Sequence, residues 1–175
     1  MTIDAASDDR SADTPVATPG RPPLSINRYV PAMIGIIANQ WSRSASTHYR
    51  RNFGIGIVEW RLMVVLAAAP WITAAQVDEM IGMDKAAVSR SVRELQKLGA
   101  VTLRPDEADP RRREMALTEA GRALYDRVVV AAIERERRAL SCLTPEECQV
   151  LVDLLGRLQR NMAAIDAAPD PPPGA

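Results

Sequence analysis

The stretch that decides the fold of this chain is DEADPRRREMALT, from Asp106 to Thr118. An acidic turn with a proline is followed by three consecutive arginines and then by residues that alternate between apolar and polar. Taken alone, such a charge cluster is typical of a solvated loop. The segments on either side decide between that interpretation and a structured hairpin.

Two alternating segments flank the cluster, Val101–Arg104 before it and Glu114–Leu117 after it. Short alternating runs separated by proline and aspartate favour two strands joined by a turn. The sequence therefore predicts a β-hairpin with strands at 101–104 and 114–117 and a long polar tip. The residues expected at or just beyond this tip are Arg111, Arg112 and Arg113.

Two short helices are predicted directly before the hairpin. Thr73 and Gln76 have the spacing of a capping box, in which each side chain satisfies a free backbone N–H of the first helical turn. Gly82 is expected to end this helix, and Asp84 to cap the next one, which Gly99 closes. The apolar residues that the first helix is expected to bury are Val77, Met80 and Ile81.

The second of these helices has two different faces. Its expected inner stripe consists of Val88, Val92, Leu95 and Leu98. Its other side carries Lys85, Ala86, Ser89, Arg90, Arg93 and Lys97. A basic face is often simply solvated, but here an arginine-bearing hairpin follows at once. Two helices joined by a tight turn and followed by such a hairpin indicate a winged helix-turn-helix, in which the hairpin is the wing.

Long amphipathic helices flank this central unit. Apolar residues recur every three or four positions between Asn27 and Asn52, and a second helix is expected at about 57–69. Thr118 is expected to cap a helix over 119–140, and Thr144 to begin another. The first helix is long for so small a protein, and a helix of this length usually needs a partner that covers it. The two long stripes are Val30, Ile34, Ile37, Trp41, Ala45 and His48, and then Cys148, Leu151, Val152, Leu155, Leu158 and Met162.

Charge is unevenly distributed along the chain. The net charge is zero overall, but residues 1–26 and 166–175 each carry −2, so that residues 27–165 carry +4. Both ends are polar or proline-rich, and we expect an N-terminal extension over 1–26 and a tail over 166–175 to be disordered. The chain has no signal-peptide pattern, no membrane-spanning run and no disulfide framework among its two cysteines, so a cytoplasmic protein is expected.

Residues 28–165 resemble the multiple-antibiotic-resistance regulator (MarR) family of winged-helix transcription factors. The resemblance rests on Asp109-Pro-Arg111 followed after five residues by Leu117-Thr118, on VSRSVRELQKLGAV from Val88 to Val101, and on Glu59-Trp60-Arg61. It implies a mainly α fold with a small β-hairpin, in which residues 57–118 form the winged helix-turn-helix. Residues 27–53 and 119–165 would then be dimerisation helices within one domain over 27–165.

The resemblance also implies a homodimer that binds a palindromic operator on double-stranded DNA, commonly as a repressor released by a small ligand. Arginine can donate two bonds to guanine, so Arg90 and Arg93 are the expected base contacts, and Ser89 suits base or phosphate. The resemblance implies that Asp109 orients Arg111, which we expect in the minor groove. Thr73 is a candidate contact to the DNA backbone, although its role as a helix cap is sufficient to explain it. The full set of expected DNA-binding residues is Thr73, Lys85, Ala86, Ser89, Arg90, Arg93, Asp109, Arg111, Arg112 and Arg113.

A ligand site is implied near the first long helix, with a small aromatic acid or its thioester as the expected class. Arg43, Arg50 and Arg51 could offer a cation to a carboxylate. The alternatives are that the tryptophans belong to the core, the arginines are solvated, and His48 lies at a dimer interface. The ligand-binding candidates are Trp41, Arg43, His48, Arg51 and Trp60.

Other functions fit the sequence less well. With one histidine, no metal-ligand spacing and no glycine-rich phosphate loop, an enzyme is not expected, nor is a metal or cofactor. A redox- or pH-responsive regulator of the same fold remains an alternative, as does a module for dimerisation or partner binding that does not bind DNA. Cys148 lies on an apolar stripe, which favours a buried, inert thiol.

Overall fold

The computed structural model describes residues 25–167, and the two ends for which disorder was predicted, 1–26 and 166–175, lie almost wholly outside that range. The chain divides into two compact units, with the boundary inside helix α1 (Val30–Phe53) between Ser44 and Ala45. After α1 come α2 (Ile57–Ala68), α3 (Ala74–Ile81) and α4 (Lys85–Lys97). The C-terminal helices are α5 (Glu119–Ala139), α6 (Pro145–Asn161) and the short α7 (Ala163–Ala167).

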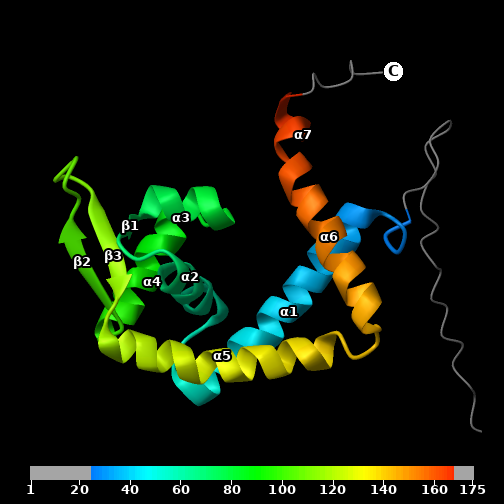
Figure 1. Cartoon of the computed structure of the whole chain (residues 1–175), viewed down its shortest axis with the longest axis horizontal. Helices are drawn as coiled ribbons and strands as arrows, with labels where there is room; N and C mark the ends of the chain where they lie inside the picture. Colours follow the sequence, from blue (N-terminus) through cyan, green and yellow to red (C-terminus); the bar gives the residue numbers. More distant parts are fainter. Residues whose placement is uncertain (1–24, 168–175) are drawn as a thin grey trace, which may run out of the picture. The chain divides into compact units, whose positions relative to one another are not determined.

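A three-stranded antiparallel sheet lies beside α3 and α4 (Figure 1). Strands β2 (Val101–Pro105) and β3 (Arg113–Leu117) form the predicted hairpin, with Val101 opposite Leu117 and Pro105 opposite Arg113. The third strand, β1 (Ile72–Thr73), pairs with β3 and was not predicted, because two residues are too few to show an alternating pattern. The fold is thus mainly helical with a small sheet, as expected from the sequence.

The predicted helix boundaries agree with the structure because the end signals act locally. The Thr73–Gln76 capping box is present: the Thr73 N–H donates to Gln76 Oε1 at 2.8 Å, and the Gln76 N–H donates to Thr73 Oγ1 at 3.4 Å. Thr118 Oγ1 accepts the N–H of Gly121 at 3.0 Å at the start of α5. Gly82 and Gly99 both have positive φ, which lets the chain turn sharply after α3 and α4.

The core of the second unit forms where α2, α4 and β3 meet. Its fully buried side chains include Leu62 and Leu66 of α2 and Val88 and Leu95 of α4. Three expectations about burial were wrong: Met80 and Ile81 of α3 and Leu98 after α4 are 45%, 40% and 48% exposed. Each lies in the last turn of its helix or just beyond it, where the neighbouring element no longer covers the stripe.

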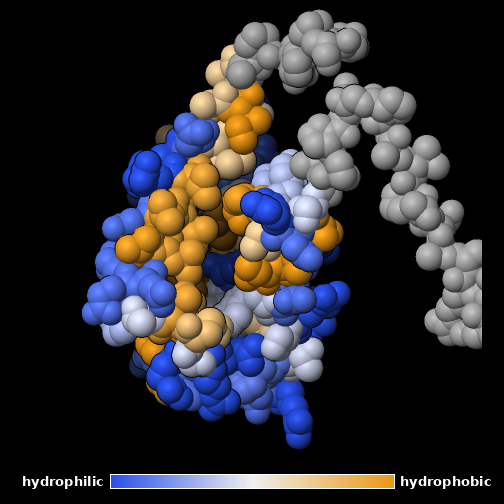
Figure 2. All heavy atoms as spheres, turned by 90° about the vertical axis from the view of Figure 1, so that its right-hand side faces the viewer, coloured by the Kyte–Doolittle hydropathy of each residue, from blue (hydrophilic) through white to orange (hydrophobic). Residues whose placement is uncertain are grey.

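The C-terminal helix α6 buries none of its side chains within the protomer. Most of its predicted apolar stripe is exposed, whereas Leu151 and Cys148, which was expected to be buried, are half-buried. Figure 2 shows large apolar side chains gathered on the face of the molecule that carries α6. No helix within residues 25–167 combines the length and the apolar character of a membrane span. The exposed apolar residues of α6 are Val150, Val152, Leu154, Leu155 and Leu158.

Candidate nucleic-acid interface

Helix α4 is fixed at its start and at its middle. Asp84 Oδ1 accepts the N–H groups of Ala86 and Ala87, both at 2.9 Å, so that the first turn is capped. In the middle, the hydroxyl of Ser91, which is only 1% exposed, donates to Glu59 Oε1 of α2 at 3.1 Å. These bonds, together with the buried stripe, leave the opposite face of α4 presented to solvent.

That exposed face consists of the residues predicted for it. Lys97 forms an ion pair with Glu94 at 2.8 Å, and Arg93 Nε donates to the carbonyl oxygen of Ser89 at 3.3 Å. In the described part of the chain, neither Lys85 nor Arg90 takes part in an ion pair. The face therefore carries positive charge that its own side chains do not neutralise. Its exposed members are Lys85, Ala86, Ser89, Arg90, Arg93 and Lys97.

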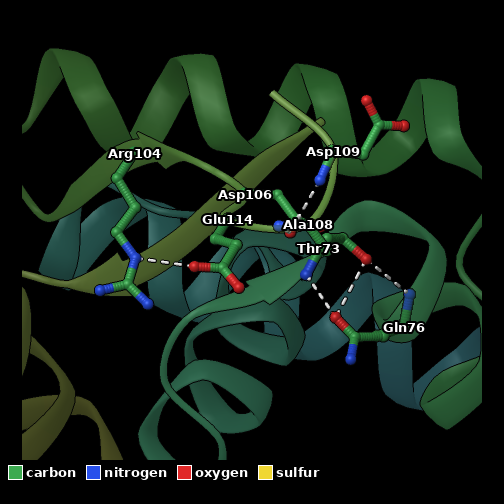
Figure 3. Close-up of polar contacts among 7 residues, drawn as sticks. All are labelled: Thr73, Gln76, Arg104, Asp106, Ala108, Asp109 and Glu114. Carbon is green, nitrogen blue, oxygen red and sulfur yellow. Dashed lines mark hydrogen bonds and ion pairs between the residues drawn. The ribbon is translucent and has the colours of Figure 1, made fainter. Parts of the chain in front are cut away.

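The wing is anchored near its tip by Arg104, which Figure 3 shows reaching across to Glu114. Arg104 Nε lies 2.7 Å from Glu114 Oε2 on the opposite strand, and its guanidinium carbon lies 4.1 Å from the ring centroid of Trp71. Trp71 has a φ of 62°, which is rare for a bulky residue, and its N–H donates to the carbonyl oxygen of Met115 at 2.9 Å. This anchor could not be predicted from the sequence, because only the β1–β3 pairing brings Trp71 to the hairpin.

The tip of the wing is held by two aspartates. Asp106 Oδ1 accepts the N–H of Ala108 at 2.8 Å and that of Asp109 at 3.4 Å, as drawn in Figure 3. Asp109 Oδ1 accepts the N–H of Arg111 at 3.1 Å, while Asp109 Oδ2 lies 3.3 Å from Arg112 Nε. Asp109 thus accepts a hydrogen bond from the main chain of Arg111, and its ion pair is with Arg112.

The three arginines of the wing differ in position. Arg112 lies at the tip and is paired with Asp109, whereas Arg113 begins strand β3 opposite Pro105. All three side chains are exposed. Within residues 25–167, no ion pair involves Arg111 or Arg113. Two uncompensated guanidinium groups are therefore available at the wing.

A groove of about 490 Å³ separates α4 from the wing. Its apolar lining comes from Val88, Val92, Leu103 and Met115. Thr73 also lines it, although its hydroxyl is engaged by Gln76 at 3.0 Å, which its capping role explains. Ala86, Arg90, Asp109 and Arg111 are not among its lining residues. The predicted DNA-binding residues that it brings together are Thr73, Lys85, Ser89, Arg93, Arg112 and Arg113.

The ligand-binding candidates fall in both units. Trp41, which is half-buried, and Arg43, which is exposed, lie in the first unit. In the second unit Trp60 is 8% exposed and stacks on Tyr125 of α5 at 5.3 Å between ring centroids. Trp60 is therefore a core residue, and its partner Tyr125 was not among the predicted residues, because α5 reaches it only through tertiary packing.

His48 and Arg51 lie near the end of α1. The His48 ring is edge-on to Tyr49 at 5.8 Å, and its Nδ1 lies 3.4 Å from Asn52 Nδ2. Arg51 is exposed. Burial raises the pKa of the Tyr49 hydroxyl, and the nearby Arg135 guanidinium opposes that rise. Sequence reasoning missed Tyr49, which occupies the position next to His48 on the helix.

Comparison with known proteins identifies the family. The family model described as "MarR family" matches residues 53–112. A MarR/EmrR family transcriptional regulator from Acinetobacter sp. ADP1 is 34% identical, with a TM-score of 0.73, and the match covers 81% of this chain and 99% of that one. The uncharacterized HTH-type transcriptional regulator YdgJ of Bacillus subtilis (strain 168) is 30% identical over 117 residues, 65% of this chain and 70% of its own length.

A more distant structure shares the fold. The PcaV transcriptional regulator from Streptomyces coelicolor, solved in complex with its natural ligand, is 19% identical with a TM-score of 0.65, covering 80% of this chain and 98% of that one. The winged helix, the exposed cationic face of α4 and the closer relatives agree with one another. This chain belongs to the MarR family of DNA-binding winged-helix transcriptional regulators.

Proposed function

We propose that this regulator acts as a homodimeric repressor that binds a palindromic operator and is released by a small aromatic acid or its thioester. The observation that carries the proposal is the exposed cationic face of α4 beside an arginine-bearing wing. Each protomer would insert α4 into the major groove, and a two-fold dimer would place two such helices about 34 Å apart. Residues 57–118 would read the DNA, and residues 27–53 and 119–165 would form the dimer.

The support for a dimer is the unburied apolar surface of the terminal helices. Helix α6 leaves Val152, Leu155 and Leu158 exposed, and in α1 Ile34 and Ile37 are exposed as well. Exposed apolar side chains in a row along a helix, as on each of these two helices, are typical of a contact surface in a protein. A second copy of the same chain is the partner that the family suggests.

The proposed DNA contacts divide by chemistry. Arg90 and Arg93 would donate to base edges in the major groove, where arginine pairs with guanine O6 and N7. Lys85, in the first turn of α4, would contact phosphate, and Ser89 either base or phosphate. Arg111 would enter the minor groove, since its guanidinium has no ion pair within residues 25–167. Arg112 and Arg113 would contact phosphate, and Asp109 would shape the tip.

The proposed release by a ligand draws on a relative and on candidate residues of this chain. A relative of the same fold was solved with its natural ligand, and the candidates in this chain are Trp41, Arg43, His48 and Arg51. Trp60, the fifth predicted ligand-binding residue, packs against Tyr125 in the core of the second unit. A thermal-shift screen of aromatic acids and their thioesters would identify a ligand by a concentration-dependent rise in the unfolding temperature.

A gel-shift titration with the DNA upstream of the protein's own gene tests the main proposal. We expect a discrete complex that persists under excess random-sequence competitor, and a dimer in sedimentation analysis. A monomer that binds no duplex at low salt would refute it. Retained binding after peroxide treatment would exclude the redox-responsive alternative, for which Cys142 and Cys148 are the candidate thiols.

A further inference from the structure

Helix α4 is bordered by a second groove, on a different side from the wing. This groove has a volume of about 710 Å³ and lies between α4, the end of α1 and the start of α2. Arg93 lines both grooves, so α4 stands between them. The charged residues that line the second groove are Arg50, Glu59, Arg90, Arg93, Glu94 and Lys97.

The carboxylates of this groove already have partners. Glu59 accepts the N–H of Gly56 at 2.9 Å and the hydroxyl of Ser91 at 3.1 Å. Glu94 is paired with Lys97 at 2.8 Å. Four cationic side chains thus face two engaged carboxylates, and the groove has a surplus of positive charge.

Besides Arg93, whose Nε donates to the carbonyl oxygen of Ser89, the groove has two cations without a carboxylate partner among residues 25–167, Arg50 and Arg90. Within the described residues, neither takes part in an ion pair. The Arg50 side chain lies against Gly56, because a Cβ atom added at Gly56 would be 3.2 Å from Arg50 Nε. The absence of a side chain at position 56 therefore leaves the space that the Arg50 guanidinium occupies beside the groove.

The dimensions of DNA suggest what this groove receives. An α-helix with its side chains is about 10–12 Å across, and the major groove of B-DNA is about 12 Å wide. A helix that enters the major groove therefore has one sugar-phosphate backbone along each side. One of these DNA backbones separates the major groove from the minor groove that the wing would enter. That backbone would pass through the first protein groove, between α4 and the wing.

We infer that the second groove binds the other sugar-phosphate backbone and that Arg50, with Arg90, neutralises its phosphates. The inference rests on the proposed entry of α4 into the major groove, and it extends the DNA interface to the end of α1. It also reassigns Arg50, which the sequence suggested as a cation for a ligand carboxylate. In the structure Arg50 shares a groove with the exposed face of α4.

The test compares full-length Arg50→Ala with the wild type on one specific duplex over a range of salt concentrations. Each phosphate contact contributes about 0.9 to the slope of log affinity against log salt concentration. Arg50→Ala should lower the slope by about that amount, which corresponds to an affinity loss of about five-fold near 0.15 M salt if the remaining contacts are unchanged. Arg50→Lys, which keeps the charge, should retain most of the slope.

Arg122→Ala is the matched control, because it removes an exposed arginine of α5 that lines neither groove. Its slope should equal that of the wild type. A wild-type slope for Arg50→Ala, with circular dichroism and unfolding temperature unchanged, would overturn the inference while leaving the proposed DNA binding intact. If the wild type binds no duplex at all, the proposed function fails, and this inference fails with it.

Discussion

The hydrogen bond between Ser91 and Glu59 gives a sharp test of how α4 is held in place. Ser91 is 1% exposed, and its hydroxyl donates at 3.1 Å to one oxygen of the Glu59 carboxylate. The other oxygen already accepts the N–H of Gly56 at 2.9 Å. Ser91→Ala keeps a small side chain at a buried position but removes the only hydrogen-bond donor of α4 to this carboxylate within residues 25–167.

The size of the effect follows from the charge and burial of the acceptor. A hydrogen bond to a charged group contributes about 1.5–3 kcal/mol, and water recovers part of this where the acceptor is accessible. Because Glu59 is half-buried, we expect Ser91→Ala to lower the free energy of unfolding by about 1.5 kcal/mol, at the lower end of that range. For a chain of this size the unfolding temperature should fall by about 3–6 °C.

The assay is urea unfolding at one fixed protein concentration, because oligomerisation makes apparent stability depend on concentration. Ser89→Ala is the matched control: it lies on the same helix but is exposed, so its stability should change by less than about 0.5 kcal/mol. A double-mutant cycle of Ser91→Ala with Glu59→Ala should give a coupling energy of about 1 kcal/mol. Strictly additive losses would refute the argument that this bond fixes α4 to α2.

Four further outcomes are expected. Gly121→Ala should lower the free energy of unfolding by about 1–3 kcal/mol, because the added Cβ would overlap the carbonyl oxygen of Ala100. An unchanged midpoint of thermal unfolding would contradict that packing. Burial raises the pKa of the Tyr49 hydroxyl above its ordinary value of 10.0. The neutral Tyr49 side chain therefore contributes to the free energy of unfolding below pH 10.0, and this contribution is lost at higher pH as the hydroxyl ionises. Unfolding measured against pH should therefore show a steeper alkaline loss for the wild type than for Tyr49→Phe. Arg93→Ala should weaken binding to the specific operator by about 1–3 kcal/mol and to random DNA much less, whereas equal losses in a binding titration would mean that Arg93 senses only charge. Arg111→Ala should reduce the salt slope by about 0.9, and an unchanged slope would argue against its insertion into the DNA.

The helix boundaries and the hairpin could be predicted from the sequence because their signals are local. Thr73, Asp84, Thr118 and Thr144 each cap a helix through a bond to a residue two or three positions away. Such bonds depend on residue type and spacing alone. The periodicity of α4 likewise separated its buried stripe from its exposed cationic face, which is why the candidate DNA-binding residues of that helix are exposed as expected.

The errors occurred where a neighbouring element decides the outcome. Whether Met80 or Leu98 is buried depends on what covers the last turn of its helix, and periodicity carries no information about that cover. The ion pair of Asp109 with Arg112 was not predicted, because it depends on how the tip of the wing folds and the sequence does not show which of two adjacent arginines pairs.

The sequence by itself determined the order of the elements, the ends of the helices and the positive charge on α4 and the wing, because these follow from contacts within a few residues. Tertiary packing was needed to show that Trp71 contacts Arg104 near the tip of the wing, that Glu59 accepts a bond from Ser91, and that Arg50 lies in a groove beside α4. Trp71 and Arg104 are 33 positions apart in the chain, and Glu59 and Ser91 are 32 apart. Arg50 is 40 positions from Arg90, the α4 residue with which it shares the groove. Packing brings such residues together through the burial of apolar side chains between α2, α4 and the sheet, which no local pattern specifies.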